Sequence, residues 1–160
     1  MSNKVVLGLG GNIGDVKSTM DKSYVLITNY IGQITLKSSL YQTKAWGVER
    51  QPDFINQVVF VETIFTPDEI LNKCLEIESE LGRKRFQKWH ERIVDIDILF
   101  FNEEIIDTEN LKIPHPFIQD RNFVLFPLVE IAPNFTHPIL KKTIQKLKND
   151  CRDKLVVTKL

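Results

Sequence analysis

Cysteine is scarce in this chain of 160 residues, where Cys74 and Cys151 are the two present. Two thiols are too few for a disulfide framework, and their separation is not that of a zinc site. Cys74 falls within a helical pattern of apolar residues and is expected in the core, whereas Cys151 falls in a polar tail. The sequence therefore predicts neither a disulfide scaffold nor a zinc centre.

Long apolar runs and a charge excess are also missing. No run is long enough to span a bilayer, and residues 1–7 lack the apolar stretch of a signal peptide, so the cytoplasm is the expected compartment. The 21 Lys and Arg residues balance 21 Asp and Glu, which argues against a surface that coats nucleic acid. The length predicts one domain over residues 1–160, and we expect a monomer whose partners are small molecules.

Hydrophobic periodicity predicts the order β-α-β-β-α-β followed by a C-terminal helical appendix. This order is typical of a ferredoxin-like α+β sandwich, with an antiparallel sheet and two helices on one face. Asp15 is expected to cap the first helix and Gly32 to follow its end, while Thr66 and Pro67 are expected to begin the second helix. Strands are predicted at residues 5–10, 34–41, 54–64 and 95–101, helices at 15–30, 66–82, 123–131 and 139–149, and a short strand near 104–106 that pairs back through the turn at 102–103.

Glycines cluster near the N-terminus, at Gly8, Gly10, Gly11 and Gly14. They superficially resemble a dinucleotide-binding fingerprint, but the third glycine of that motif is missing, and no Walker phosphate loop occurs in the chain. A turn that needs positive φ explains these glycines, and Asn12 could anchor it.

Two aspartates, Asp95 and Asp97, stand one residue apart in an apolar run. In a strand they point to the same face with about 7 Å between their Cα atoms, and that face is expected to continue into Leu99 and Phe101. Paired carboxylates at the rim of a core are costly without a partner, and one or two Mg²⁺ ions would suit them. The alternative is an ordinary half-exposed strand, which is the commoner case for an isolated pair of this kind.

A basic segment at residues 83–92 precedes these aspartates and holds five Lys and Arg against one Glu. Cations leading into paired carboxylates suit a nucleotide phosphate site, because metals and Arg side chains share the phosphate oxygens. Phe86 and Trp89 interrupt the charges, which favours a loop that closes over a ligand. A solvated helix face is the alternative.

These residues carry a family resemblance that extends along nearly the whole chain. Its strongest match is residues 92–99, supported by residues 10–15, 39–43, 51–56, 81–83, 114–116 and 121–123. The chain resembles the 6-hydroxymethyl-7,8-dihydropterin pyrophosphokinases of folate biosynthesis. The resemblance implies transfer of the terminal diphosphate of ATP to the hydroxymethyl oxygen of the pterin, with release of AMP.

The resemblance also implies roles for individual residues. Asp95 and Asp97 would hold two Mg²⁺ ions, and Arg83 and Arg92 would stabilise the transferring group, so these four are the expected catalytic residues. The pterin would stack between aromatic rings and pair with an amide, and its expected contacts are Thr43, Ala45, Trp46, Phe54, Asn56, Trp89 and Phe123. The expected ATP contacts are Glu78, Arg83, Arg85, Trp89, Arg92, Ile98, Lys112, His115 and Arg121.

Some residues depart from the family pattern. His90 and Glu91 stand where the family usually has a small residue and often has proline, and Lys44 and Trp46 lie in a loop that often carries Pro and Leu.

Two other classes of protein are alternatives. The same element order builds RNA-recognition modules, but their aromatic signature and basic surface are missing here. A metal-dependent phosphohydrolase would need a positioned water and a general base, and the residues beside the aspartate pair do not suggest one.

Overall fold

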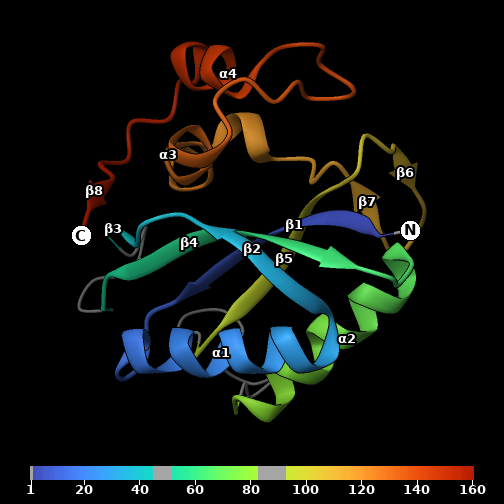
Figure 1. Cartoon of the computed structure of the whole chain (residues 1–160). Coiled ribbons are helices and arrows are strands. Elements are labelled where there is room, and N and C mark those ends of the chain that lie inside the picture. The colour runs from blue at the N-terminus through green and yellow to red at the C-terminus, as the bar shows by residue number, and fades with distance from the viewer. Residues whose placement is uncertain (1, 45–51, 83–92) are drawn as a thin grey trace.

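The computed structural model describes residues 2–44, 52–82 and 93–160, and its main feature is a six-stranded antiparallel sheet (Figure 1). The strand order is β5-β1-β4-β3-β8, with β2 also pairing with β4. If the four predicted strands are numbered along the chain, their order across the sheet is 4-1-3-2, with the second observed as β2 and β3. This order confirms the ferredoxin-like α+β fold. The strands are β1 (Asn3–Gly11), β2 (Gly32–Lys37), β3 (Tyr41–Thr43), β4 (Phe54–Thr63), β5 (Asp95–Phe101) and β8 (Thr158–Lys159).

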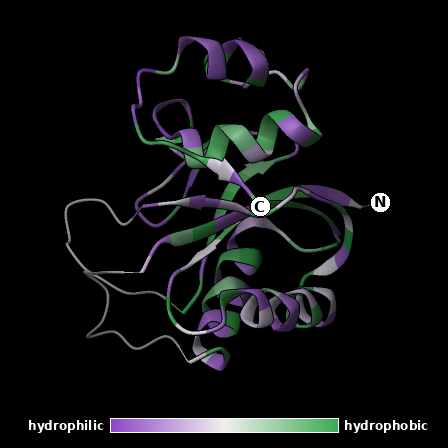
Figure 2. Ribbon diagram, turned by 90° about the vertical axis from the view of Figure 1, so that its left-hand side faces the viewer, coloured by the Kyte–Doolittle hydropathy of each residue, from purple (hydrophilic) through white to green (hydrophobic). Residues whose placement is uncertain are grey.

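Helices cover both faces of the sheet (Figure 1). The helices α1 (Val16–Tyr30) and α2 (Pro67–Glu80) lie on one face, and α3 (Asn122–Ile131) and α4 (Ile144–Asp150) lie on the other. A short 3₁₀ helix at Ile118–Asp120 precedes α3. Figure 2 shows that α3 is largely hydrophobic while α4, farther from the sheet, is more polar. Among the described residues, none of the helices is long and apolar enough to cross a membrane.

Local side-chain capping sets the starts of the first two helices, as predicted. The Asp15 carboxylate accepts a hydrogen bond from the Ser18 backbone N–H at 3.1 Å. At α2 the Thr66 hydroxyl accepts from the Glu69 N–H at 3.3 Å, and the Glu69 carboxylate accepts from the Thr66 N–H at 3.1 Å. Each cap satisfies amide groups that have no partner within the helix.

Gly32 comes after the end of α1 as predicted, directly following the C-cap residue Ile31, but glycine is required there by a tertiary contact. It is also the first residue of β2 and pairs with Thr63 of β4. A Cβ atom on Gly32 would lie 1.9 Å from the carbonyl oxygen of Glu62. The close approach of two backbones therefore requires glycine at this position.

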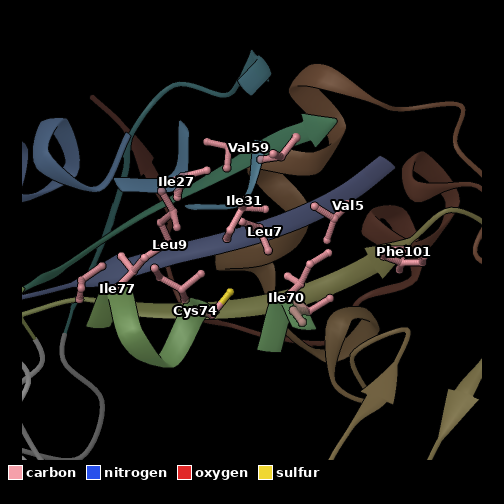
Figure 3. Packing of buried hydrophobic residues seen from close by; sticks show 14 of the residues in the cluster. Val5, Leu7, Leu9, Ile27, Ile31, Val59, Ile70, Cys74, Ile77 and Phe101 are labelled. Atoms are coloured by element: carbon pink, nitrogen blue, oxygen red, sulfur yellow. The ribbon is translucent and has the colours of Figure 1, made fainter. Parts of the chain in front are cut away.

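The main core lies between the sheet and the pair α1 and α2 (Figure 3). Alternate residues of β1 point into it, and Val5, Leu7 and Leu9 are each at most 2% exposed. Cys74 of α2 is 1% exposed in the same cluster, as predicted, and burial raises the pKa of its thiol. Each such aliphatic side chain contributes about 1.5–3 kcal/mol through burial, so this face fixes the orientation of β1.

The other residues of β1 point toward α3, and a β-bulge in β5 changes one of our expectations. Val6 pairs with Phe100 and Leu7 pairs with Ile98, so Leu99 is an extra residue in the ladder. Leu99 stays on the side of Asp95 and Asp97, but Phe101 packs in the opposite core with Val5. The prediction that Phe101 shares the aspartate face is therefore wrong, because a strict period of two fails across a bulge.

The predicted strand at residues 34–41 is two strands, β2 and β3, with a break at residues 38–40. The Ser38 hydroxyl accepts a hydrogen bond from the Val58 N–H at 3.0 Å, and the Ser38 N–H donates to the Val58 carbonyl at 2.9 Å. A side-chain oxygen thus replaces a ladder partner and lets the chain bend between the two strands.

Two further expectations about the second half of the chain need correction, and one strand there was not predicted. The short strand β6 (Ile106–Asp107) pairs with β7 (Lys112–Ile113) and does not pair back through the turn at residues 102–103. The last helix begins at Ile144 rather than at residue 139, because Thr143 caps it by accepting from the Lys146 N–H at 3.2 Å. The strand β8 was not predicted, and it joins the sheet through β3.

One carboxylate connects α3 to this edge of the sheet. Glu130 of α3 accepts hydrogen bonds from the Ser39 N–H at 2.8 Å, the Ser39 hydroxyl at 2.7 Å and the Tyr41 hydroxyl at 2.9 Å. Lys159 of β8 lies 3.6 Å from the same carboxylate. Burial acts to raise the pKa of Glu130, but the hydrogen bonds from Ser39 and Tyr41 outweigh it and leave that pKa below its usual value. Burial and the Glu130 carboxylate raise the pKa of Tyr41 to about 12.

Replacing Glu130 by Gln should lower the free energy of unfolding at neutral pH by about 1 kcal/mol, since the side chain is partly exposed. The folded-state pKa is below the unfolded one, so the carboxylate stabilises the fold above the unfolded pKa. The difference between wild type and Glu130→Gln should shrink as pH falls below about 4. Urea unfolding across this pH range measures it, with Glu103→Gln, in an exposed turn, as control. A difference independent of pH would contradict the prediction.

Candidate active site

A pocket of about 230 Å³ lies between α3 and the centre of the sheet. Its lining comes from β1, β3, β4, β5 and α3, together with Lys44, Arg121 and Leu155, which lie outside these elements. The pocket combines carboxylates, an amide, aromatic rings and a guanidinium, and its members are far apart in sequence.

Two glycines of β1 form the base of this pocket. Gly10 pairs with Asp95 of β5 on one side and with Asn56 of β4 on the other. Gly8 pairs in the same way with Asp97 and Val58. Because neither glycine has a side chain, the space above the central strand stays open between the carboxylates and the residues of β4.

Asp95 and Asp97 both line the pocket, so their carboxylates share one face as predicted. Asp95 is half-buried and Asp97 is exposed. Within the described ranges 2–44, 52–82 and 93–160, no group of three or more His, Cys, Asp or Glu side chains could hold a metal ion. Two carboxylates are hard oxygen ligands that leave several positions of a Mg²⁺ ion for water or phosphate, so the donor set fits a shared metal rather than a closed protein cage.

His115 lies near the Asp97 carboxylate although it is distant in sequence. The backbone N–H of His115 donates to the Leu99 carbonyl at 3.0 Å, and the ring Nδ1 accepts from the backbone N–H of Phe117 at 3.2 Å. Burial lowers the pKa of His115, the Asp97 carboxylate opposes that shift, and the Arg121 guanidinium adds to it. An imidazole that accepts at Nδ1 carries its proton on Nε2, so near neutral pH His115 is an uncharged donor.

Arg121 links the charged part of the pocket to its aromatic part. Its guanidinium lies 5.0 Å from the ring centre of Phe117 and 5.6 Å from that of Phe123. Such cation–π contacts hold a guanidinium in place while leaving its N–H groups able to bind an anion. Arg121 and Phe123 both line the pocket, so the guanidinium and the ring face the same space.

Four of the predicted pterin contacts come together here, from three different elements. Thr43 of β3, Phe54 and Asn56 of β4 and Phe123 of α3 all line the pocket. Thr43 pairs with Phe54, and Tyr41, two residues earlier in β3, pairs with Asn56. Aromatic rings with an amide and backbone groups at their edge suit a flat ligand that has hydrogen-bonding groups on its rim.

Other predicted residues lie away from the pocket lining or outside the described part of the chain. Glu78 is buried on α2, where its carboxylate accepts from the Ile96 N–H at 3.0 Å. The Ile98 side chain packs in the core between the sheet and α2, and the contact predicted for this residue is through its backbone. Lys112 pairs with Asp107 at 2.9 Å on the surface. The predicted residues outside the described ranges are Ala45, Trp46, Arg83, Arg85, Trp89 and Arg92.

The predicted strand at residues 5–10 is confirmed, because Gly8 and Gly10 belong to β1, and the strand continues through Gly11. The expectation that a turn with positive φ explains all four early glycines is wrong, since only Gly14, with φ of 67°, has positive φ. The alternation of Val6, Gly8 and Gly10 could have indicated a strand with one open face. Asn12 does anchor the turn as predicted, because its Nδ2 donates to the Pro52 carbonyl at 3.1 Å.

Comparison with known proteins agrees with this geometry. The model of the 7,8-dihydro-6-hydroxymethylpterin-pyrophosphokinase family matches residues 6–133. The chain is 43% identical over 144 residues to a 2-amino-4-hydroxy-6-hydroxymethyldihydropteridine pyrophosphokinase of Aquifex aeolicus, covering 90% of this chain and 89% of that one. It is 42% identical over 133 residues to the protein of that name from Bacillus subtilis, covering 82% and 80%.

A solved structure supports the fold independently. The Plasmodium falciparum HPPK-DHPS structure superimposes with a TM-score of 0.76 over 93% of this chain at 19% identity. The match spans 44% of that longer chain, so it bears on the fold of one part of it. The extent of the family match and the identity to relatives of similar length together show that this chain belongs to the 7,8-dihydro-6-hydroxymethylpterin-pyrophosphokinase family.

Proposed function

We propose that this enzyme transfers the terminal diphosphate of ATP to the hydroxymethyl oxygen of 6-hydroxymethyl-7,8-dihydropterin, releasing AMP, as a step of folate biosynthesis. One observation carries the proposal. The paired carboxylates and the aromatic and amide residues lie on the two sides of Gly10 in a single pocket. A metal-bound phosphate chain and a flat heterocycle would therefore meet there, as transfer between them requires.

In this proposal Asp95 and Asp97 hold two Mg²⁺ ions with the phosphates of ATP. When bound, the metals would neutralise phosphate charge and activate the attacking hydroxyl. His115 and Arg121, which lie by Asp97, would bind phosphate oxygens as neutral and charged donors. Arg83 and Arg92 are proposed to stabilise the transferring group, with Arg85, Trp89, Glu78, Ile98 and Lys112 proposed around the nucleotide.

The pterin would occupy the aromatic side of the pocket. Phe54 and Phe123 would stack on its two faces, while the Asn56 amide, which both donates and accepts, would pair with its aminopyrimidinone edge. Thr43 and the proposed contacts Ala45, Trp46 and Trp89 would complete the site. Binding of RNA to this face is disfavoured, because α3 covers it and carboxylates line it.

Formation of AMP should depend strictly on the pterin. With ATP and Mg²⁺ alone we expect no AMP, and on adding 6-hydroxymethyl-7,8-dihydropterin we expect AMP and the pterin diphosphate in equal amounts. Chromatography of the nucleotides and pterins measures both products. Release of ADP and inorganic phosphate without the pterin would instead support the phosphohydrolase alternative.

Removing either carboxylate should abolish most of the activity while leaving the fold intact. Asp95→Ala and Asp97→Ala should each lower kcat/KM by roughly two to three orders of magnitude, as expected for the loss of an electrostatic group that acts on the transition state. Steady-state kinetics over a range of Mg²⁺ concentrations tests this, with Asp21→Ala on the exposed face of α1 as the control. Near-normal turnover at ordinary Mg²⁺ concentrations would rule out the two-metal assignment.

Asn56 should contact the pterin and not the nucleotide. Asn56→Ala should weaken pterin binding by about 1–3 kcal/mol, the cost of leaving polar groups of the ligand unpaired. ATP affinity should change little, because phosphates would be held on the other side of Gly10. Calorimetric titration of each ligand gives both values, and Asn29→Ala on α1 is the control. An equal loss of ATP affinity at an unchanged melting temperature would place Asn56 in the nucleotide site.

A further inference from the structure

We propose that Gly10 is a positioning residue for the Asn56 amide, and that the missing Cβ atom at this position fixes where the pterin edge binds. The inference rests on the proposed function. Gly10 is the partner of Asn56 in the ladder between β1 and β4, and it is also the partner of Asp95 in the ladder between β1 and β5. It therefore lies between the residue proposed to bind the pterin and one proposed to bind the metals.

The Asn56 side chain occupies the space that a side chain on residue 10 would need. A Cβ atom built on Gly10 would lie 2.6 Å from Oδ1 of Asn56 and 3.7 Å from its Cγ. Two such atoms cannot approach within 3.0 Å without one of them shifting. The amide thus lies over residue 10 of the central strand, and only glycine leaves room for this orientation.

Gly8 and Gly32, two other glycines of the sheet, do not have this relation to a functional group. A Cβ atom on Gly8 would lie 3.4 Å from Cδ1 of Leu99, which is an ordinary contact with an apolar side chain. At Gly32 the obstacle is a backbone carbonyl 1.9 Å away, so that glycine is required by the fold itself. At Gly10 the obstacle is the end of one side chain, which can rotate away at little cost to folding.

This difference predicts what a methyl group on residue 10 would do. The fold can accept it by turning the Asn56 amide, but the amide then no longer lies where the ligand edge needs it. On the far side of β4, Tyr41 pairs with Asn56 and is held by Glu130, so the strand itself cannot easily follow. A small displacement of a positioning group is enough to lower both affinity and rate.

Gly10→Ala should therefore weaken pterin binding about 10- to 100-fold and raise the KM for the pterin, while the KM for ATP changes less than about twofold. Binding of 6-hydroxymethyl-7,8-dihydropterin is measured by calorimetry with Mg²⁺ and a non-hydrolysable ATP analogue present. Gly8→Ala is the matched variant, because it adds the same methyl group to the same face of β1 without meeting Asn56.

A double-mutant cycle with Asn56→Ala separates positioning from simple blockage of the pocket. If Gly10 acts through the amide, Gly10→Ala should cost less than about twofold further in the Asn56→Ala background. If the methyl group blocks the ligand directly, the loss should be the same in both backgrounds, and the inference is overturned. Gly8→Ala should change pterin affinity by the same factor in the wild-type and Asn56→Ala proteins, because it does not act through the amide.

Melting temperatures complete the experiment. Should Gly10→Ala lower the melting temperature, the Asn56→Ala background must restore it, since the obstructing atom is then gone, and a melting temperature that stays low overturns the inference. A weakened Asn56→Ala with an unaffected Gly10→Ala also overturns the inference but leaves the proposed function intact. Full pterin binding by Asn56→Ala itself would instead contradict the proposed pterin site.

Discussion

The rest of this structure depends on the two faces of β1, one of which is buried in the core while the other leaves the pocket open. On one face Val5, Leu7 and Leu9 are buried against α1 and α2, and this burial holds the strand at the centre of the sheet. On the other face Gly8 and Gly10 provide no side chains, although glycine in a strand interior is unfavourable by itself. The strand tolerates them because its aliphatic face and two neighbouring ladders already fix its position.

The pocket over these glycines is completed by polar contacts rather than by further apolar packing. The Glu130 carboxylate binds Ser39 and Tyr41 and so ties α3 to β3, which places Phe123 and Thr43 on two walls of the same pocket. The Arg121 guanidinium, at the start of α3, lies over the rings of Phe117 and Phe123 and so presents a cation beside the aromatic wall. Hydrogen bonds are directional, so those of Glu130 set the distance between α3 and β3 more closely than apolar burial does.

The proposed chemistry needs this kind of arrangement. Transfer of a diphosphate group depends mostly on placing two substrates and neutralising charge, and little on a covalent role for the protein. A sheet that is rigid in its centre can carry carboxylates on β5 and an amide on β4 at a fixed separation, with one glycine strand between them. The further contacts proposed at residues 45–46 and 83–92 lie outside the described part of the chain and would complete the site.

The sequence by itself determined the features that depend on near neighbours. The caps at Asp15 and Thr66, the order of the first elements and the shared face of Asp95 and Asp97 all follow from interactions within a few residues. The family resemblance added Thr43, Phe54, Asn56 and Phe123, and these line one pocket, although no periodicity distinguishes them from core residues.

Tertiary structure decided the features that depend on distant partners. The bulge at Leu99, the break at Ser38, the pairing of β6 with β7 and the addition of β8 each require a second strand that lies far away in sequence. The position of the open face of Gly8 and Gly10, between Asp95 of β5 and Asn56 of β4, likewise depends on ladders that join distant segments. Strand register and close approach are set by non-local contacts, and a single sequence contains local preferences without those contacts.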